Sequence, residues 1–157
     1  MITGLFETHV DVKNLEQSVE FYKQLPGLTP CHYDEQRRIA FFWVGAPQKF
    51  MLGLWEKPAK EVVPRHFAFQ CESEWILKES VAFLHSKQIQ SYNFLKDGTE
   101  RPMVFAWMPA VAIYFEDPDG NILEFISIID GEAKPHLGVL AYEEWIHLQG
   151  KSSSAGV

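Results

Sequence analysis

Apolar and polar residues alternate along several short segments of the chain, and this period of two predicts β-strands. Clusters rich in Gly, Pro, Asp or Asn separate most of these segments, as expected for turns. Residues 103–108 are apolar but undecided between a strand and a loop over a pocket. The predicted strands span residues 4–12, 28–34, 38–44, 50–56, 65–71, 89–94, 112–115 and 122–129.

Two segments show helical spacing instead. Leu15, Val19 and Tyr22 recur at i, i+4 and i+7, and Asn14 stands before them as an N-cap, with a helix end expected near Pro26-Gly27. Leu77, Val81 and Leu84 repeat that spacing, with Ser73 as the expected cap. The order strand, helix and three strands therefore occurs twice.

The two halves match each other position by position. His9 matches His66 on the first strand of each half, and Gly53 matches Glu124 on the last. We therefore predict an α+β fold of one domain, residues 1–130, made of two βαβββ modules at about 4–56 and 64–129. Residues 131–157 form a C-terminal extension, with a short helix expected at 142–148 and a tail expected to fray from Lys151.

Composition and charge exclude several classes of partner. With 46% hydrophobic residues the chain can bury a core, and a formal net charge of -7 disfavours nucleic acid and anionic membranes as partners. We find no signal-peptide pattern and no apolar run long enough to span a bilayer, so we expect a cytoplasmic protein. Cys31 and Cys71 lie far apart and are expected to stay reduced.

Glu124 is the one carboxylate inside an apolar strand that follows the Asp117-Pro118-Asp119-Gly120 turn. Burying it alone would be costly, so it needs an arginine such as Arg65 or Arg101, a hydrogen-bond network or a metal ion. If the modules pack about a pseudo-twofold axis, His9, His66 and Glu124 converge. Two imidazoles and one carboxylate suit a first-row divalent metal, although a single histidine on a strand is more often an ordinary hydrogen-bonded residue.

At these residues the chain resembles the vicinal oxygen chelate superfamily, which includes glyoxalase I, fosfomycin resistance proteins, extradiol dioxygenases and bleomycin resistance proteins. The resemblance covers residues 4–129. It rests on the opening His-x-x-Val, on Asn-Leu-x-x-Ser-Val-x-Phe-Tyr, on His66-Phe-Ala-Phe, and on Tyr114-Phe-Glu-Asp-Pro-Asp-Gly-Asn-Ile-Leu-Glu124. It implies a cup-shaped mixed sheet with helices outside, commonly in a homodimer, around a divalent ion (Fe, Mn, Zn or Ni) held by His9, His66 and Glu124.

Departures from the subfamily patterns leave the reaction open. Gly53 stands where glyoxalase I enzymes carry a fourth ligand. Ala112 replaces the small polar residue typical of fosfomycin thiol transferases, and the arginine expected after the ligand strand has no clear counterpart. The histidine that precedes the tyrosine in extradiol dioxygenases is absent between Thr99 and Ile113.

These observations predict a metal-dependent enzyme for a small substrate that chelates through adjacent oxygens, acting as a dioxygenase, lyase, isomerase or transferase. Tyr114 is the candidate catalytic residue, as a hydrogen-bond donor to a developing oxyanion, with a core-packing role as the alternative. Aromatic residues including Trp43, Trp55, Phe105 and Trp107 favour an apolar or aromatic substrate. The competing predictions are a non-enzymatic binding protein of the resistance type and a family member without metal.

Overall fold

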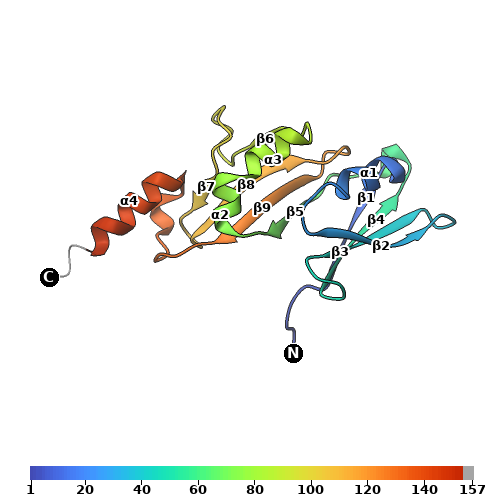
Figure 1. Ribbon diagram of the computed structural model, residues 1–157, viewed down its shortest axis with the longest axis horizontal. Helices are drawn as coiled ribbons and strands as arrows, with labels where there is room; N and C mark the ends of the chain where they lie inside the picture. Colours follow the sequence, from blue (N-terminus) through green and yellow to red (C-terminus); the bar gives the residue numbers. More distant parts are fainter. Residues whose placement is uncertain (154–157) are drawn as a thin grey trace. The chain divides into compact units, whose positions relative to one another are not determined.

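The computed structural model describes residues 1–153, and its contacts divide them into two compact units. Unit 1 comprises Met1–Arg65 together with Asp117–Asn121, and unit 2 comprises His66–Glu116 and the residues from Ile122 onward. Both contain mixed sheets flanked by helices, so the predicted α+β class is confirmed (Figure 1).

Unit 1 contains a four-stranded sheet in the order β1-β4-β3-β2. Strands β1 and β4 are parallel and the other pairs are antiparallel. The helix α1 packs against β3 and β4, and the apolar side chains beneath it, among them Val10, Leu52 and Phe42, are buried. The elements are β1 (Glu7–Val12), α1 (Leu15–Tyr22), β2 (Leu28–Asp34), β3 (Ile39–Val44), β4 (Phe50–Glu56) and the 3-10 turn η1 (Ala59–Glu61).

The start of α1 is as predicted. The Asn14 side chain accepts a hydrogen bond of 2.8 Å from the Gln17 backbone N–H, which satisfies one of the free donors of the first turn. The helix ends at Tyr22, before the predicted Pro26-Gly27, because backbone bonds from Gln24 and Leu25 tighten the chain into turns.

Unit 2 contains a sheet in the order β10-β7-β8-β9-β5, with β6 paired to β8. Strands β5 and β9 are parallel, and the other pairs are antiparallel. The elements are β5 (His66–Gln70), α2 (Ser73–Lys78), α3 (Ser80–Ser86), β6 (Ser91–Tyr92), β7 (Met103–Phe105), β8 (Ala110–Glu116), β9 (Ile122–Ile128), η2 (Pro135–Leu137), β10 (Val139–Ala141) and α4 (Tyr142–Ser153).

The predicted second helix is two helices, which corrects the sequence interpretation. Ser73 is the first helical residue rather than the cap, and Glu72 at the cap makes no side-chain bond. The chain leaves helical geometry at Glu79, and the Ser80 hydroxyl donates to the Ile76 carbonyl at 2.6 Å. The buried residues of the two helices are Ile76, Ser80 and Leu84, so Leu84 of the predicted stripe is buried while Leu77 and Val81 are only half-buried.

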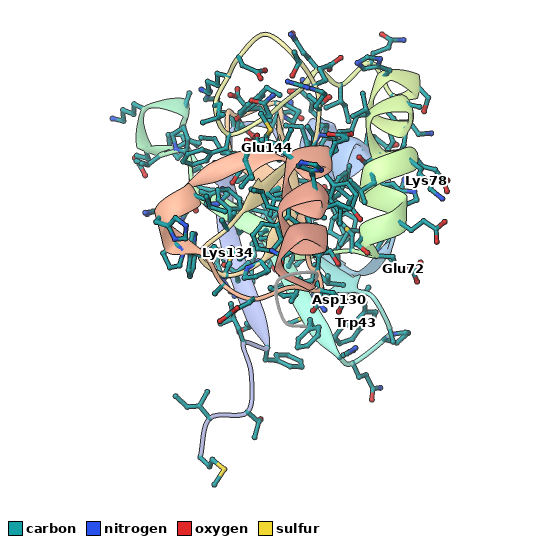
Figure 2. All side chains as sticks on the ribbon, turned by 90° about the vertical axis from the view of Figure 1, so that its left-hand side faces the viewer. Trp43, Glu72, Lys78, Asp130, Lys134 and Glu144 are labelled. Carbon is teal, nitrogen blue, oxygen red and sulfur yellow. The ribbon has the colours of Figure 1, made fainter. Side chains whose placement is uncertain are left out.

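Helices α2 and α3 lie over one face of the unit 2 sheet (Figure 1). Phe115 and Phe125 on that face are buried, and Phe125 packs edge-on against Trp75 of α2 with 5.1 Å between ring centroids. On the outer side of α2, Lys78 points away from the sheet and pairs with Glu74 at 2.6 Å (Figure 2). Side chains on the other face of this sheet, including Glu124, are free of α2 and α3.

The C-terminal extension contributes to the unit 2 sheet. Strand β10 pairs with β7, with Val139 opposite Phe105. Trp145 of α4 is fully buried, and its Nε1 donates to the Asp130 carbonyl at 3.3 Å. Helix α4 is longer than predicted, beginning at Tyr142 and ending at Ser153, and the rest of the predicted tail lies outside the described residues.

The Asp-Pro-Asp-Gly turn is an anchor within unit 1. Oδ2 of Asp117 accepts hydrogen bonds from the Tyr22 hydroxyl and the Asn121 amide, both at 2.8 Å, and Oδ1 accepts the backbone N–H groups of Asp119 and Asn121. Asp119 accepts the Lys13 backbone N–H at 3.1 Å and the Ser18 hydroxyl at 3.3 Å. The turn that precedes the Glu124 strand is thus fastened to α1 by buried hydrogen bonds.

Candidate metal centre

His66 and Glu124 come together on the face of the unit 2 sheet opposite to α2 and α3, which we call the open face. Parallel pairing of β5 with β9 places His66 opposite Ile122, one same-face position from Glu124. His66 Nε2 lies 3.3 Å from Glu124 Oε2. The imidazole is half exposed and the Glu124 side chain is 5% exposed. One side chain of the pair is therefore in contact with solvent and the other is buried.

The hydrogen bonds of this pair define a position for a cation. His66 Nδ1 lies 3.0 Å from the Ile122 carbonyl oxygen, and because a carbonyl only accepts, Nδ1 carries a proton. In a neutral ring Nε2 then presents its lone pair to a carboxylate oxygen, so two acceptors face each other. A proton or a metal ion must lie between them for this contact to be favourable.

Glu124 has a second unsatisfied feature. Its Oε1 is buried and has no hydrogen-bond partner among the described residues. Burial raises the pKa of Glu124, while the Tyr114 hydroxyl and the His66 imidazole partly offset that rise. An orphaned carboxylate oxygen beside an oriented imidazole fits a divalent ion, which would take both donor atoms.

Tyr114 adjoins this pair on the neighbouring strand. Antiparallel pairing of β8 with β9 sets Tyr114 directly opposite Glu124, and its ring centroid is 5.9 Å from that of His66. The side chain is 8% exposed. Burial and the nearby Glu124 charge raise the pKa of the phenol, so Tyr114 is a hydrogen-bond donor at neutral pH.

His9 is in unit 1, on β1, directly opposite Gly53 of β4. Its ring lies beside the rings of Phe41 and Trp55, with centroids 5.7 and 5.6 Å away, and its Nε2 is 3.7 Å from Glu7 Oε2. A Cβ at position 53 would stand 2.7 Å from His9 Cδ2. The space that a side chain at position 53 would take is therefore occupied by the His9 ring.

The structure brings two of the three predicted ligands together. No group of three or more His, Cys, Asp or Glu side chains suited to a metal ion occurs among residues 1–153. The convergence of His9 with His66 and Glu124 stays a prediction. The arginine alternative is not what is found, since the ionisable side chain beside Glu124 is His66, and Arg101 instead lies 3.7 Å from Asp97.

An apolar cluster extends from Glu124 along the open face. Ile122 and Ile126, which share a face of β9 with Glu124, pack there against Ala112 and Tyr114. The sequence interpretation missed Tyr92, Met108 and Val139, which join the same cluster. Tyr92 could have been found from its aromatic character near a strand, but its pairing with Tyr114 depends on β6 meeting β8.

The fold and this arrangement define a class: α+β proteins of two βαβββ modules in which a histidine starts the second module and a glutamate lies on its last strand. Residues 5–125 match the family model described as Glyoxalase/Bleomycin resistance protein/Dioxygenase superfamily. The chain belongs to this superfamily.

Several solved structures share this fold. An integron cassette protein from the mobile metagenome of the Halifax Harbour sewage outfall is 35% identical, with a TM-score of 0.68 over 81% of this chain and 100% of that one. The fosfomycin resistance protein FosX from Listeria monocytogenes, complexed with Mn(II) and sulfate, is 22% identical, with a TM-score of 0.60 over 82% and 93%.

Lactoylglutathione lyase from Agrobacterium tumefaciens is 19% identical, with a TM-score of 0.61 over 80% of this chain and 94% of that one. The likeness to this lyase and to FosX is one of fold. A search of curated proteins gave no match. In the part of the chain that the structure describes, no helix is long and apolar enough to cross a membrane.

Proposed function

We propose that the protein is a divalent-metal-dependent enzyme of the glyoxalase and dioxygenase type, with His9, His66 and Glu124 as ligands. The observation that carries the proposal is the His66–Glu124 contact, in which His66 Nε2 lies 3.3 Å from Glu124 Oε2 and the other carboxylate oxygen is buried without a hydrogen-bond partner among the described residues. His9, the repeat equivalent of His66, supplies the third donor.

A bound Fe, Mn, Zn or Ni ion would act as a Lewis acid toward adjacent oxygens of a small substrate. The chain's own residues prepare that site. The Ile122 carbonyl holds the His66 ring so that Nε2 points at Glu124, and burial keeps water from the carboxylate. Tyr114, with its raised pKa, donates a hydrogen bond to the substrate oxygen on which negative charge develops.

Position 53 favours a site with three protein ligands. A longer side chain there would displace the His9 ring, so the remaining coordination positions are left to substrate oxygens and water. This arrangement supports a dioxygenase, lyase or transferase step over the four-ligand glyoxalase I reaction. The apolar cluster beside Glu124 supports an apolar or aromatic substrate. We place the enzyme in the cytoplasm as a homodimer, the usual assembly in the superfamily.

The second candidate is a non-enzymatic protein that binds a small molecule or antibiotic. The observation in its favour is the aromatic and apolar surface around Tyr114, which can hold an apolar ligand without a metal. It leaves unexplained why a carboxylate is buried within that surface with one oxygen unpartnered.

Metal content separates the two candidates. We would purify wild type, Glu124→Gln and Glu116→Gln without added metal and measure first-row metals by mass spectrometry. Glu116 is the matched control because it is an exposed glutamate on the neighbouring strand. We expect metal close to one ion per chain in wild type and Glu116→Gln, and its loss in Glu124→Gln. Metal absent from all three, with an apolar ligand still bound, would establish the binding protein.

A further inference from the structure

The two histidines at equivalent positions of the repeat are held in different ways. The His66 ring is oriented by a hydrogen bond, with Nδ1 3.0 Å from the Ile122 carbonyl oxygen. His9 makes no such bond within residues 1–153, and Glu7 Oε2, at 3.7 Å from Nε2, lies beyond hydrogen-bond distance. A histidine that binds a metal normally has its second ring nitrogen fixed by an acceptor. Some other contact must therefore orient the His9 ring.

Aromatic packing orients His9. Phe41 meets the imidazole edge-on, with 5.7 Å between ring centroids and 72° between the planes. Trp55 instead lies alongside it, at 5.6 Å and 32°. The side-chain torsion about Cβ–Cγ is broad for a free histidine, and a turning ring sweeps out the space beside it. The indole occupies that space, so it limits the rotation that would carry the ring nitrogens away from their present direction.

Strand register places the two rings together. His9 of β1 lies opposite Gly53 of β4, and Asp11 lies opposite Trp55. Trp55 is therefore the next residue after Gly53 on the same face of β4, diagonal to His9. Gly53 leaves room beneath the imidazole, and Trp55 closes the space beside it.

Trp55 is itself held by contacts other than His9. The Arg37 guanidinium carbon lies 5.6 Å from the indole centroid and Lys57 Nζ lies 5.8 Å from it, both within the range of cation–π attraction. Arg37 belongs to the turn between β2 and β3, where its backbone N–H donates to Asp34 Oδ1 at 2.9 Å. Residues from two other segments thus fix the indole against which His9 rests.

The polar atom of Trp55 takes no part in this arrangement. Its Nε1 is buried and has no hydrogen-bond partner in the described part of the chain. A buried donor without a partner costs stability, which a phenylalanine or leucine at this position would not incur. What tryptophan adds here in return is a large, electron-rich aromatic face for the imidazole.

We infer that Trp55 is the positioning residue of His9, and that its indole holds the imidazole in the orientation in which it binds the metal ion. This inference rests on the proposed function, because it needs His9 as a ligand. The indole face also favours the positive character that an imidazole gains when one of its nitrogens binds a cation. The requirement is thus for an aromatic ring at position 55 and not for its N–H group.

Nickel binding to full-length, metal-free protein tests the inference. We would titrate Ni(II) by calorimetry into wild type, Trp55→Leu, Trp55→Phe, Trp43→Leu and His9→Ala, and measure the stability of each by urea unfolding. Trp43 is the matched control because it is a half-buried tryptophan on β3 of the same sheet, opposite Met51, and its ring does not pack on His9.

We expect Trp55→Leu to bind Ni(II) about 10-fold more weakly than wild type, the effect typical of losing a group that orients a metal ligand. His9→Ala should lose at least as much. Trp55→Phe should recover most of the affinity, and Trp43→Leu should bind like wild type whatever stability it loses.

Tryptophan fluorescence gives a second measurement. Quenching by bound Ni(II) falls steeply with distance, so at equal occupancy the ion should quench a larger fraction of the emission in wild type than in Trp55→Phe. If Trp55→Leu does not fold, this comparison decides the matter: equal fractions quenched would overturn the inference.

The outcomes separate the inference from the proposed function. If Trp55→Leu binds Ni(II) as tightly as wild type, or Trp55→Phe as weakly as Trp55→Leu, the inference is overturned, and the metal site stands as long as His9→Ala loses affinity. Unchanged affinity in His9→Ala would remove His9 from the ligands and overturn the inference as well. If wild type binds no Ni(II), the proposed function fails and the inference fails with it.

Discussion

Gly53 lies directly beneath the imidazole of His9. A Cβ at position 53 would stand 2.7 Å from His9 Cδ2 and 2.9 Å from Phe41 Cε1, closer than real Cβ contacts allow. The glycine is needed for this space and not for its backbone flexibility, since it is not among the glycines with positive φ.

Gly53→Ala should therefore move the His9 ring. We expect a loss of about 1–3 kcal/mol in the free energy of unfolding from overpacking and a fall of about tenfold in metal affinity from misplacing the imidazole. Urea unfolding and metal titration measure the two effects. Gly4→Ala, whose added Cβ meets nothing within 4 Å, is the control. Equal behaviour of the two variants would contradict the prediction.

Tyr22→Phe should weaken the attachment of the 117–121 turn. The substitution removes the 2.8 Å bond to Asp117 and leaves a buried carboxylate oxygen with one partner fewer. We expect a loss of about 1–3 kcal/mol in the free energy of unfolding, measured by urea denaturation. Tyr33→Phe removes an exposed hydroxyl that donates to Glu16, and should cost much less. An equally large loss in Tyr33→Phe would show that the buried Tyr22–Asp117 hydrogen bond contributes no more to stability than the exposed Tyr33–Glu16 bond.

Added Mn(II) should stabilise the folded protein. An ion that binds only the native state contributes about 2.7 kcal/mol at a hundred times its dissociation constant. We expect the midpoint of thermal unfolding to rise with Mn(II) in wild type and to stay fixed in His66→Ala. His32→Ala, which removes an exposed histidine of β2, should respond like wild type. A full response in His66→Ala would place the ion elsewhere.

Asp97 should make stability depend on pH in the acid range. Hydrogen bonds from Asn93 and Thr99 lower the pKa of Asp97 from 3.8 to about 2. Since the folded pKa is depressed, this stabilisation is present above pH 3.8 and is lost as pH falls toward 2. The difference in free energy of unfolding between wild type and Asp97→Asn should shrink across that window. A free-energy difference that stays constant with pH would show that the charge of the Asp97 carboxylate does not stabilise the loop formed by residues 93–99.

Sequence patterns were sufficient for the main strands and for the polar residues at their ends. Strand β4 begins and ends where alternation predicts, and Asn14 caps α1, because both depend on residues near in sequence. Ser73 was wrong as a cap, since the helix already includes it and Glu72 takes the cap position. The single predicted helix was wrong because the chain leaves helical geometry at Glu79, where the Ser80 hydroxyl bonds the Ile76 carbonyl. That competition between local hydrogen bonds leaves no distinct mark on the apolar periodicity.

The candidate site was predictable in its residues and not in its contacts. The internal repeat was enough to select His66 and Glu124. The 3.0 Å contact between His66 Nδ1 and the Ile122 carbonyl depends on the register of two strands that are 56 residues apart, and no local pattern specifies it.

The 117–121 turn sets an order of events during synthesis. Residues 1–65 contain the Tyr22 hydroxyl, the Ser18 hydroxyl and the Lys13 amide, whose carboxylate partners come about a hundred residues later. While the ribosome is still making the second module, unit 1 lacks five of its residues. The N-terminal unit therefore gains these buried hydrogen bonds only after residues 117–121 have been translated, which is later than most of the second module.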